Sequence, residues 1–338
     1  MKRRIVYIDN FLVEHGYTPA TGATLTALFA REGYDVVRAG TKKNKVARLL
    51  EMLAAIIRNR QAVVLIAVYS TSAFYFAWAC AQLCRLIGAI YIPCLHGGNL
   101  PERVAKSPVL CRQIFARSYT NVVVSGYLQQ CIAEKKWPSV LIPNSINIKL
   151  YPFLLRSQIQ PKLLWVRSFH AIYNPALAIK LVKALLPKYP SVLLTMVGPD
   201  KDGSMEKCKT LAVELGVSGN IHFTGRLSQA GWAALSASHD VFINTTNFDN
   251  LPVSVIEAMA LGMPVVSTDA GGLKYLVKNR ENGMLAGTGD VAAFQLAVEA
   301  LLVDAGLTAG LSQAARQTAE TFDELHVLQA WHTLLKGP

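Results

Sequence analysis

The chain has 338 residues, of which 52% are hydrophobic and 17% charged, and its formal net charge is +12. This length predicts two domains of about 150 residues each, and the composition excludes a disordered or low-complexity chain. Six cysteines occur without a Cys-x-x-Cys pair or a nearby Cys/His cluster, so neither a zinc site nor a disulfide framework is predicted. The N-terminal segment runs directly into an apolar strand without a signal-peptide core, which favours an intracellular protein.

The positive charge is concentrated in the first half of the chain. Residues 1–150 carry 19 Lys and Arg against 7 Asp and Glu, whereas residues 151–338 carry 15 of each. A basic domain of this kind suits anionic lipid, nucleic acid or a polyanionic acceptor. Because no nucleic-acid-binding motif accompanies the charge, we expect an anionic membrane surface as a partner and no nucleic acid.

The first half alternates strand and helix patterns, which predicts a parallel sheet. The expected strands cover residues 4–8, 34–37, 62–69, 89–95 and 122–126, and the expected helices cover 23–31 and 74–86. Residues 62–84 carry no charge, so a hydropathy scan would also propose a membrane span there. The β-branched residues of 62–69 and the polar turn that follows favour a strand, a turn and a buried helix instead.

Residues 42–60 predict an amphipathic helix with a basic polar face. Val46, Leu49, Leu50, Leu53 and Ile57 share one side of it. The candidate membrane-binding residues around this side are Lys42, Lys43, Lys45, Arg48, Arg58 and Arg60. Such a helix can lie in the plane of an anionic bilayer, or it can pack its apolar side on the sheet with the cations in solvent. Both alternatives are open.

The most informative stretch is Asn247–Gly272. A polar turn follows an apolar strand and opens a helix, which Gly262 and Pro264 end before another apolar strand begins. Asp249 or Asn250 is expected to cap this helix, with Pro252 in its first turn. A helix that opens at the carboxyl end of a parallel strand presents free N–H groups and a positive dipole end, which favour an anion such as a diphosphate.

This stretch resembles the signature of glycosyltransferase family four, whose members are nucleotide-sugar-dependent enzymes with the GT-B fold. The matching frame is Asp249, Glu257 eight positions later, the run Ala258-Met259-Ala260, the strand that starts with Gly262-Met263-Pro264-Val265-Val266, and Gly271-Gly272. Two departures occur: the first acid is Asp rather than Glu, and Asn250-Leu251-Pro252 replaces the usual Gly-Phe-Gly turn. An ordinary buried helix would explain the Glu257 run alone, but not the whole frame.

The resemblance implies an α/β GT-B fold with two Rossmann-like, doubly wound parallel-sheet domains facing a cleft. The implied domains are residues 1–147 on the acceptor side and residues 148–315 on the nucleotide-sugar side, with 316–338 as a helix crossing back to the first. The implied reaction retains anomeric configuration and needs no cofactor and no metal in the site. Asp200-x-Asp202 could otherwise hold the metal of a different glycosyltransferase fold, but the two-domain order favours a solvated turn.

The resemblance also implies roles for individual residues. His96, Asp249 and Glu257 are the candidate catalytic residues, with Asp249 orienting the transferred sugar and Glu257 accepting from the ribose. Arg167 is the candidate diphosphate clamp, because Asn174-Pro175 replaces the family's usual Lys-Gly. The candidate donor-binding residues are Thr21, Gly22, Gly97, Arg167, His170, Gly198, Arg226, Asn250, Leu251, Pro252 and Val253.

Purely structural alternatives stay open for several of these residues. His96 could be a structural histidine and Gly22 a plain turn glycine. Asp249 could only cap its helix, Glu257 could only pair within it, and Arg226 could be a solvated loop cation.

The expected function is transfer of a sugar from a nucleotide-diphosphate sugar, UDP- in preference to GDP-, to a glycan or lipid-linked acceptor in cell-surface polysaccharide or lipopolysaccharide synthesis. The expected location is the cytoplasm, peripherally at the inner face of the cytoplasmic membrane. One alternative is a nucleotide-sugar epimerase on the same fold, which would need no acceptor. Another is a non-catalytic sugar-binding or scaffold subunit, for which the missing lysine and the altered acidic turn would be the reason.

Overall fold

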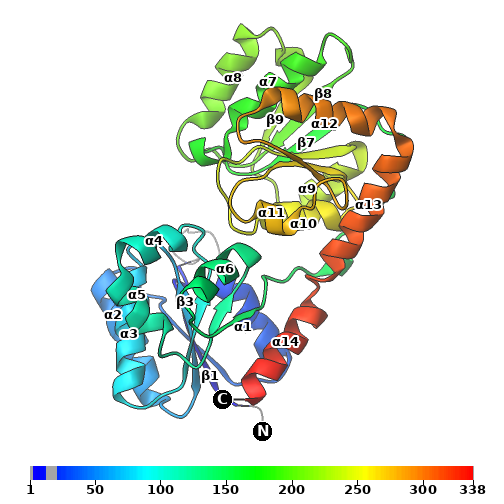
Figure 1. Ribbon diagram of the computed structural model, residues 1–338. Helices are drawn as coiled ribbons and strands as arrows, with labels where there is room; N and C mark the ends of the chain where they lie inside the picture. Colours follow the sequence, from blue (N-terminus) through cyan, green and yellow to red (C-terminus); the bar gives the residue numbers. More distant parts are fainter. Residues whose placement is uncertain (1–2, 13–20, 338) are drawn as a thin grey trace. The chain divides into compact units, whose positions relative to one another are not determined.

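The computed structural model describes residues 3–12 and 21–337 and divides into two compact units, each with its own sheet (Figure 1). The first unit comprises Met1–Ser145 and Glu324–Pro338, and the second comprises Ile146–Asp323. Each sheet has six strands, and every neighbouring pair of strands is parallel. The predicted α/β class with two doubly wound sheets is therefore confirmed.

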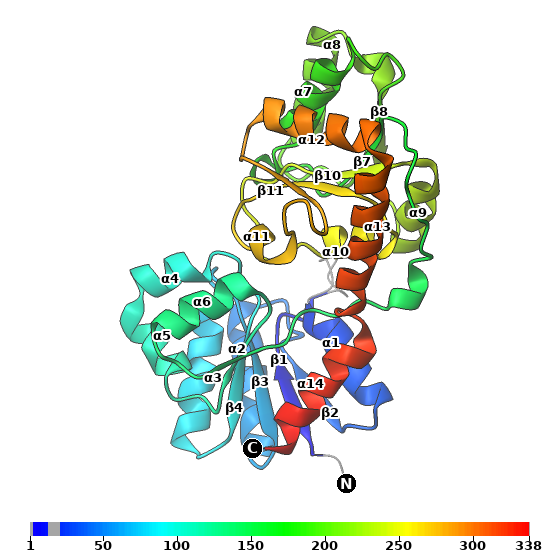
Figure 2. The ribbon, with the colours of Figure 1, turned by 45° about the vertical axis from the view of Figure 1, so that its right-hand side comes forward.

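The first unit has the strand order β2-β1-β3-β4-β5-β6. Its strands are β1 (Ile5–Ile8), β2 (Val36–Ala39), β3 (Val63–Val68), β4 (Tyr91–Leu95), β5 (Asn121–Val123) and β6 (Ser139–Leu141). Its helices are α1 (Thr21–Arg31), α2 (Lys45–Arg58), α3 (Phe74–Leu86), α4 (Leu100–Lys106), α5 (Pro108–Phe115), α6 (Gly126–Glu134) and α14 (Glu324–Lys336). Helices α1 and α14 lie on one side of the sheet, and α2 and α3 lie on the other (Figure 2). The central strands are buried on both faces for this reason, which explains their uninterrupted apolar sequences.

The chain ends in the first unit, because α14 packs there. Its apolar side, with Val327, Leu328 and Trp331, joins the core that contains α1. The rings of Trp331 and Phe29 meet edge to face, with centroids 5.4 Å apart. The crossing helix predicted for residues 316–338 begins at Glu324, and the preceding helix lies in the second unit.

The second unit has the strand order β12-β11-β10-β7-β8-β9. Its strands are β7 (Lys162–Val166), β8 (Leu193–Val197), β9 (Ile221–Gly225), β10 (Val241–Asn244), β11 (Val265–Thr268) and β12 (Met284–Ala286). Its helices are α7 (Pro175–Leu185), α8 (Ser204–Glu214), α9 (Gln229–Leu235), α10 (Val253–Ala260), α11 (Leu273–Leu276), α12 (Val291–Val303) and α13 (Ala305–Glu320). Helices α7 and α12 cover one face of the sheet, and α9, α10 and α11 cover the other (Figure 1).

In both sheets the strand order reverses beside the first strand. β1 lies between β2 and β3, and β7 lies between β8 and β10. The connections on the two sides of such a point leave toward opposite faces, so a crevice opens at the carboxyl ends of the strands. In the first unit Asp9 and Tyr69 follow the strands at this point, and in the second unit Arg167 and Thr245 do. A ligand site is therefore expected at these positions.

The length and apolarity of the described helices bear on whether one of them could span a bilayer. None of those within 3–12 and 21–337 is by itself both long and apolar enough to cross a membrane. Helices α12 and α13 reach that length and apolarity only together, as a pair bent by 104°. The uncharged residues 62–84 form β3, a turn and most of α3, as the sequence predicted.

Candidate functional site

The crevice of the second unit brings Arg167 and Asp249 together. Arg167 follows β7, Asp249 lies in the loop after β10, and their side chains form an ion pair. The Arg167 guanidinium also lies over the Tyr173 ring, 4.5 Å from its centroid. Burial lowers the pKa of Arg167, and its Nε is buried without a hydrogen-bond partner among the described residues. The sequence assigned these two residues separate roles and did not indicate that they touch.

The Gly-Gly pair of the sequence frame packs against the loop that carries Asp249. A Cβ atom on Gly272 would lie 1.7 Å from the carbonyl oxygen of Asn250, and one on Gly271 would lie 2.3 Å from that of Asp249. The Gly272 N–H donates to the Asp249 carbonyl at 2.8 Å. The two glycines therefore fix the backbone beneath Asp249, since no side chain fits between the two loops.

Helix α10 opens at this loop without a side-chain cap. Its N-cap is Pro252, so the prediction that Asp249 or Asn250 caps the helix is wrong. The Asp249 carboxylate instead accepts from the Asn250 N–H at 2.8 Å and pairs with Arg167. The Ser254 hydroxyl, in the first turn, is buried without a hydrogen-bond partner in the described part of the chain. The first turn thus presents uncapped N–H groups beside a cation, an arrangement that suits an anion.

Glu257 projects from α10 and is only 7% exposed. Its Oε1 accepts from the hydroxyl of Tyr151 at 2.5 Å and from Gln229 Nε2 at 2.6 Å. Burial raises the pKa of Glu257, and these hydrogen bonds and the charge of Arg167 oppose the rise. Tyr151 and Gln229 were not predicted, because no local pattern connects positions 151, 229 and 257.

The remaining candidates of the second unit have visible structural roles or lie outside this group. Gly198 follows β8 at φ +152°, and a Cβ atom there would lie 1.7 Å from the Arg167 carbonyl oxygen. The Nδ1 of His170 accepts from the Ile172 N–H at 3.1 Å, and its side chain is 46% exposed. Arg226 is exposed after β9, Leu251 and Val253 are partly buried, and Pro252 is buried.

The carboxylates of the Asp-x-Asp turn hold backbone rather than one another. Asp200 accepts from the Gly203 N–H at 3.0 Å. Asp202 accepts from the N–H groups of Ser204 and Ala171 at 3.1 and 2.9 Å. Within the described ranges no group of three or more His, Cys, Asp or Glu side chains could hold a metal. The carboxylates of this turn therefore tie neighbouring segments of backbone together.

The crevice of the first unit is built around Asp9, which is 2% exposed. Its carboxylate accepts from the N–H groups of Asn10 and Gly22, at 2.7 and 3.2 Å, and from the hydroxyl of Tyr69 at 3.0 Å. A Cβ atom on Gly22 would lie 2.6 Å from Asp9 Oδ2, so Gly22 is required by close packing. Thr21 begins α1, but its side chain is outside the part of the chain that the structure describes. Asp9 and Tyr69 were missed, although each is the first residue after an apolar strand run.

His96 follows β4 in the same crevice. Its ring lies 6.0 Å from that of Tyr69, and its Nε2 lies 3.4 Å from the Tyr7 hydroxyl. Burial lowers the pKa of His96 to about 4, so the ring is neutral at neutral pH. Its Nδ1 is buried without a hydrogen-bond partner in residues 3–12 and 21–337. A Cβ atom on Gly97 would lie 2.7 Å from the Ser70 amide nitrogen, so this glycine lets the loops after β3 and β4 approach.

Asp9 gives the first unit a testable dependence on pH. Burial raises its pKa from 3.8 to about 6, so the folded chain binds the proton more tightly than the unfolded chain. Stability due to this group therefore rises as pH falls from about 7 to about 4, by roughly 3 kcal/mol. We expect Asp9→Asn to gain stability relative to wild type at pH 7 and to lose this advantage toward pH 4. The difference in their free energies of unfolding, measured by denaturant titration, should change by this amount between the two pH values. A difference that stays flat across this range contradicts the assignment.

Helix α2 exposes three of the five residues on the apolar side that the sequence identified, whereas Leu49 and Leu53 are partly buried. Val46, Leu50 and Ile57 are 68, 60 and 57% exposed, whereas Met52 and Ile56 are buried in the core. Lys42, Lys43, Lys45, Arg58 and Arg60 are exposed around this side. The prediction that Arg48 is a membrane-binding residue is wrong, because the residue is only 6% exposed. Its guanidinium lies 5.3 Å from the centroid of the Phe76 ring on α3, so it belongs to the packed face of the helix.

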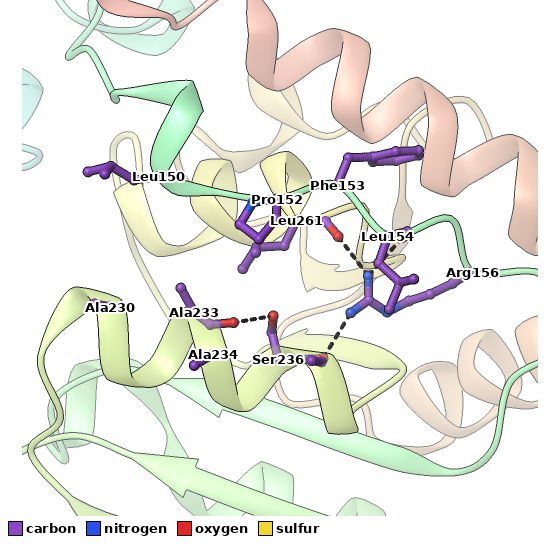
Figure 3. Close-up of a pocket in the computed structure, with 11 residues that line it drawn as sticks. Leu150, Pro152, Phe153, Leu154, Arg156, Ala230, Ala233, Ala234, Ser236 and Leu261 are labelled. Carbon is purple, nitrogen blue, oxygen red and sulfur yellow. Dashed lines mark hydrogen bonds between the residues drawn. The ribbon is translucent and has the colours of Figure 1, made fainter.

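A separate pocket of about 510 Å³ lies between α9 and the segment 150–156 (Figure 3). Arg156 closes one side of it and donates to the carbonyl oxygens of Leu154, Ser236, His239 and Leu261, at 2.7–3.1 Å. This arginine is 4% exposed, and burial lowers its pKa to about 10. Because these hydrogen bonds of the guanidinium all go to backbone carbonyls, we assign Arg156 to fastening this segment onto the second unit.

Two Rossmann-type parallel sheets, each with polar residues collected at its switch point, define the fold class. The fold is GT-B, shared with the crystal structure of Anabaena HepE in complex with UDP at a TM-score of 0.81 and 17% identity. That match covers 99% of this chain and 100% of HepE. Residues 153–318, which hold Arg167, Asp249 and Glu257, match the family described as glycosyl transferases group 1. This match covers 166 of the 338 residues and confirms the resemblance at the level of the group.

Curated relatives match part of this chain. The lipopolysaccharide core biosynthesis glycosyltransferase LpsE of Rhizobium meliloti is 30% identical over 131 residues, covering 39% of this chain and 37% of LpsE. An N,N'-diacetylbacillosaminyl-diphospho-undecaprenol alpha-1,3-N-acetylgalactosaminyltransferase of Campylobacter jejuni is 26% identical over 199 residues, covering 59% of this chain and 47% of that enzyme. The matches thus span less than half the length of these relatives.

Proposed function

We propose that this protein is a retaining glycosyltransferase that uses a nucleotide-diphosphate sugar, with a UDP-sugar as the preferred donor. The observation that carries the proposal is the Arg167–Asp249 pair beside the uncapped first turn of α10. It lies at the switch point of a group 1 domain, where doubly wound sheets bind nucleotides. UDP is favoured because the structural neighbour HepE was crystallised with UDP and with UDP-glucose.

The chemistry needs charge stabilisation more than a nucleophile. Cleavage of the sugar–phosphate bond leaves the bonding electrons on the diphosphate. Arg167 and the free N–H groups of the first turn of α10 would stabilise that charge. The acceptor hydroxyl forms the new bond on the same face of the sugar and gives its proton to the departing phosphate. Asp249, paired with Arg167, would orient the hydroxyls of the transferred sugar.

The donor assignment is tested by a thermal-shift screen with UDP-, GDP- and ADP-sugars, followed by product analysis with and without an acceptor. A ligand at 100 times its Kd stabilises the folded protein by about 2.7 kcal/mol. We expect the UDP-sugars to give the largest shift. A chain that none of these nucleotides stabilises contradicts the proposal, and conversion of the donor without any acceptor supports an epimerase instead.

The acceptor we propose is a glycan or lipid-linked glycan of cell-surface polysaccharide or lipopolysaccharide synthesis. The relatives named above act in lipopolysaccharide core synthesis and on an undecaprenol-linked sugar, as their names state. An acceptor of this kind is held at a membrane, and α2 offers an apolar side ringed by exposed cations. We therefore propose peripheral attachment of the first unit to the cytoplasmic face of an anionic membrane.

The membrane contact predicts a specific effect of charge reversal on α2 and the residues before it. Each cation near an anionic bilayer contributes about 1 kcal/mol, so reversing Lys42, Lys43 and Lys45 to Glu should weaken binding to phosphatidylglycerol vesicles by about 100-fold or more. Co-sedimentation at physiological salt measures this, with phosphatidylcholine vesicles as reference. The matched control reverses three exposed lysines of the second unit, Lys183, Lys201 and Lys207. Equal losses in both variants would show a general charge effect and remove the assignment to α2.

A further inference from the structure

Glu257 is held by two side chains that are distant from it in the sequence. Besides their hydrogen bonds to Glu257 Oε1, Gln229 Nε2 donates to the Tyr151 hydroxyl oxygen, so the three side chains form a closed triangle. Tyr151 is 1% exposed. A closed arrangement of this kind restricts the rotation of all three groups, because turning any one of them breaks two hydrogen bonds.

Both donors use the same carboxylate oxygen. Neither Tyr151 nor Gln229 donates to Glu257 Oε2, and no other side chain in the described ranges does so. An ionised carboxylate accepts hydrogen bonds on both of its oxygens. The triangle therefore fixes the carboxylate and leaves Oε2 as the oxygen that can accept from a ligand hydroxyl.

Tyr151 is itself anchored to the helix that carries Glu257. Arg316 Nη1, from α13, donates to the Tyr151 carbonyl at 2.8 Å and to the Ala260 carbonyl at 2.7 Å. Ala260 is the last residue of α10. One guanidinium thus joins the backbone of Tyr151 to the carboxyl end of α10, while the Tyr151 hydroxyl reaches Glu257 within that helix.

We propose that Tyr151 and Gln229 are positioning residues that orient Glu257 so that its Oε2 accepts from the ribose hydroxyls of the nucleotide sugar. Neither residue contacts the reacting atoms, so they set donor affinity and ribose selectivity rather than the rate of bond cleavage. This inference rests on the proposed function, because it assigns a ligand to the same site. It adds that Tyr151 and Gln229 affect binding of the ribose part of the donor.

The electrostatics of the site add a readout that a purely structural role would not move. Two titratable or charged groups act on Glu257. Tyr151 lies in the segment that leads to β7, and Arg167 follows β7. The hydrogen bond from Tyr151 lowers the pKa of Glu257 against the effect of burial. Removing the Tyr151 hydroxyl raises the pKa of Glu257, so the carboxylate is protonated at a higher pH. As pH is lowered, nucleotide binding by the variant should therefore be lost earlier, at a higher pH than in wild type.

The experiment compares UDP with 2′,3′-dideoxy-UDP by isothermal titration calorimetry on the full chain. Wild type should prefer UDP. In Tyr151→Phe we expect UDP affinity to fall by about 10-fold and dideoxy-UDP affinity to stay the same, because the lost interaction acts through the ribose hydroxyls. In sugar transfer KM should rise while kcat is retained. Gln229→Ala should act in the same direction, and Tyr189→Phe is the control, since its hydroxyl is buried without a hydrogen-bond partner within the described residues.

The outcomes separate this inference from the proposed function. If wild type binds UDP but Tyr151→Phe weakens UDP and dideoxy-UDP equally, or changes neither, the positioning role is overturned and the donor site stands. If wild type binds no nucleoside diphosphate, the proposed function fails and the inference fails with it. If UDP selectivity over dideoxy-UDP is lost in Tyr151→Phe and in Glu257→Gln alike, and not further in the double variant, the positioning role is supported.

Discussion

Replacing Arg167 by methionine or Asp249 by asparagine is expected to reduce kcat/KM for sugar transfer by about 100- to 1,000-fold. Removing one preorganised group that stabilises developing charge has an effect of this size. The two side chains are 21% and 15% exposed, so their ion pair is largely shielded from water. Each single replacement leaves the partner's charge unpaired and should also lower the free energy of unfolding, by about 3 kcal/mol.

The double variant separates stability from catalysis. With methionine at 167 and asparagine at 249, neither member of the pair leaves the other's charge unpaired, and replacing a buried pair by neutral groups is often neutral for stability. We therefore expect the unfolding midpoint of the double variant to return toward that of wild type, while kcat/KM stays as low as in the single variants. Activity that recovers together with stability would mean that the pair serves the fold alone, and the proposed donor site would then be abandoned.

The sequence predicted the architecture because both sheets are parallel and doubly wound. Strands buried on two faces must be apolar throughout, and the connecting helices must carry caps, breakers and one polar side. The run from Phe74 to Leu86 was predicted with the bounds that the structure shows, although Arg85 is its only charged residue. The Asn247–Gly272 frame was recognised by its resemblance to a family signature, and its Gly271-Gly272 pair meets backbone within the same segment.

The contacts that complete the two crevices could not be predicted in the same way. Asp9 meets Tyr69 across 60 residues, and Tyr151 meets Glu257 across 106. Such pairs follow from the strand order, which places the ends of β1 and β3 side by side, and from the path of segment 146–151. The spacing of apolar residues within one stretch of sequence carries no information about the strand order or about the path of that segment. The incorrect cap at Asp249 has the same origin, because its carboxylate is taken by a cation 82 positions earlier in the chain.

The close packing of the Gly271-Gly272 pair leads to a second prediction, which concerns Gly272. Its backbone has φ −82°, a conformation that alanine adopts without strain, so any effect of Gly272→Ala is due to the added methyl group. That Cβ atom would lie 1.7 Å from the Asn250 carbonyl oxygen and 2.7 Å from its carbonyl carbon. The backbone next to Asp249 therefore has to move. A displacement of about 1 Å in a catalytic group costs about 100-fold, so we expect kcat/KM to fall by at least that factor.

Gly310 provides the matched control for this replacement. It lies in α13, and a Cβ atom there would meet nothing within 4 Å. Gly310→Ala should stabilise the helix by about 0.5–1 kcal/mol and leave sugar transfer unchanged. Thermal unfolding and steady-state kinetics on both variants measure the two effects. If Gly272→Ala transfers sugar at the wild-type rate, the Asp249 loop can shift without loss, and its position in the structure is not what the chemistry depends on.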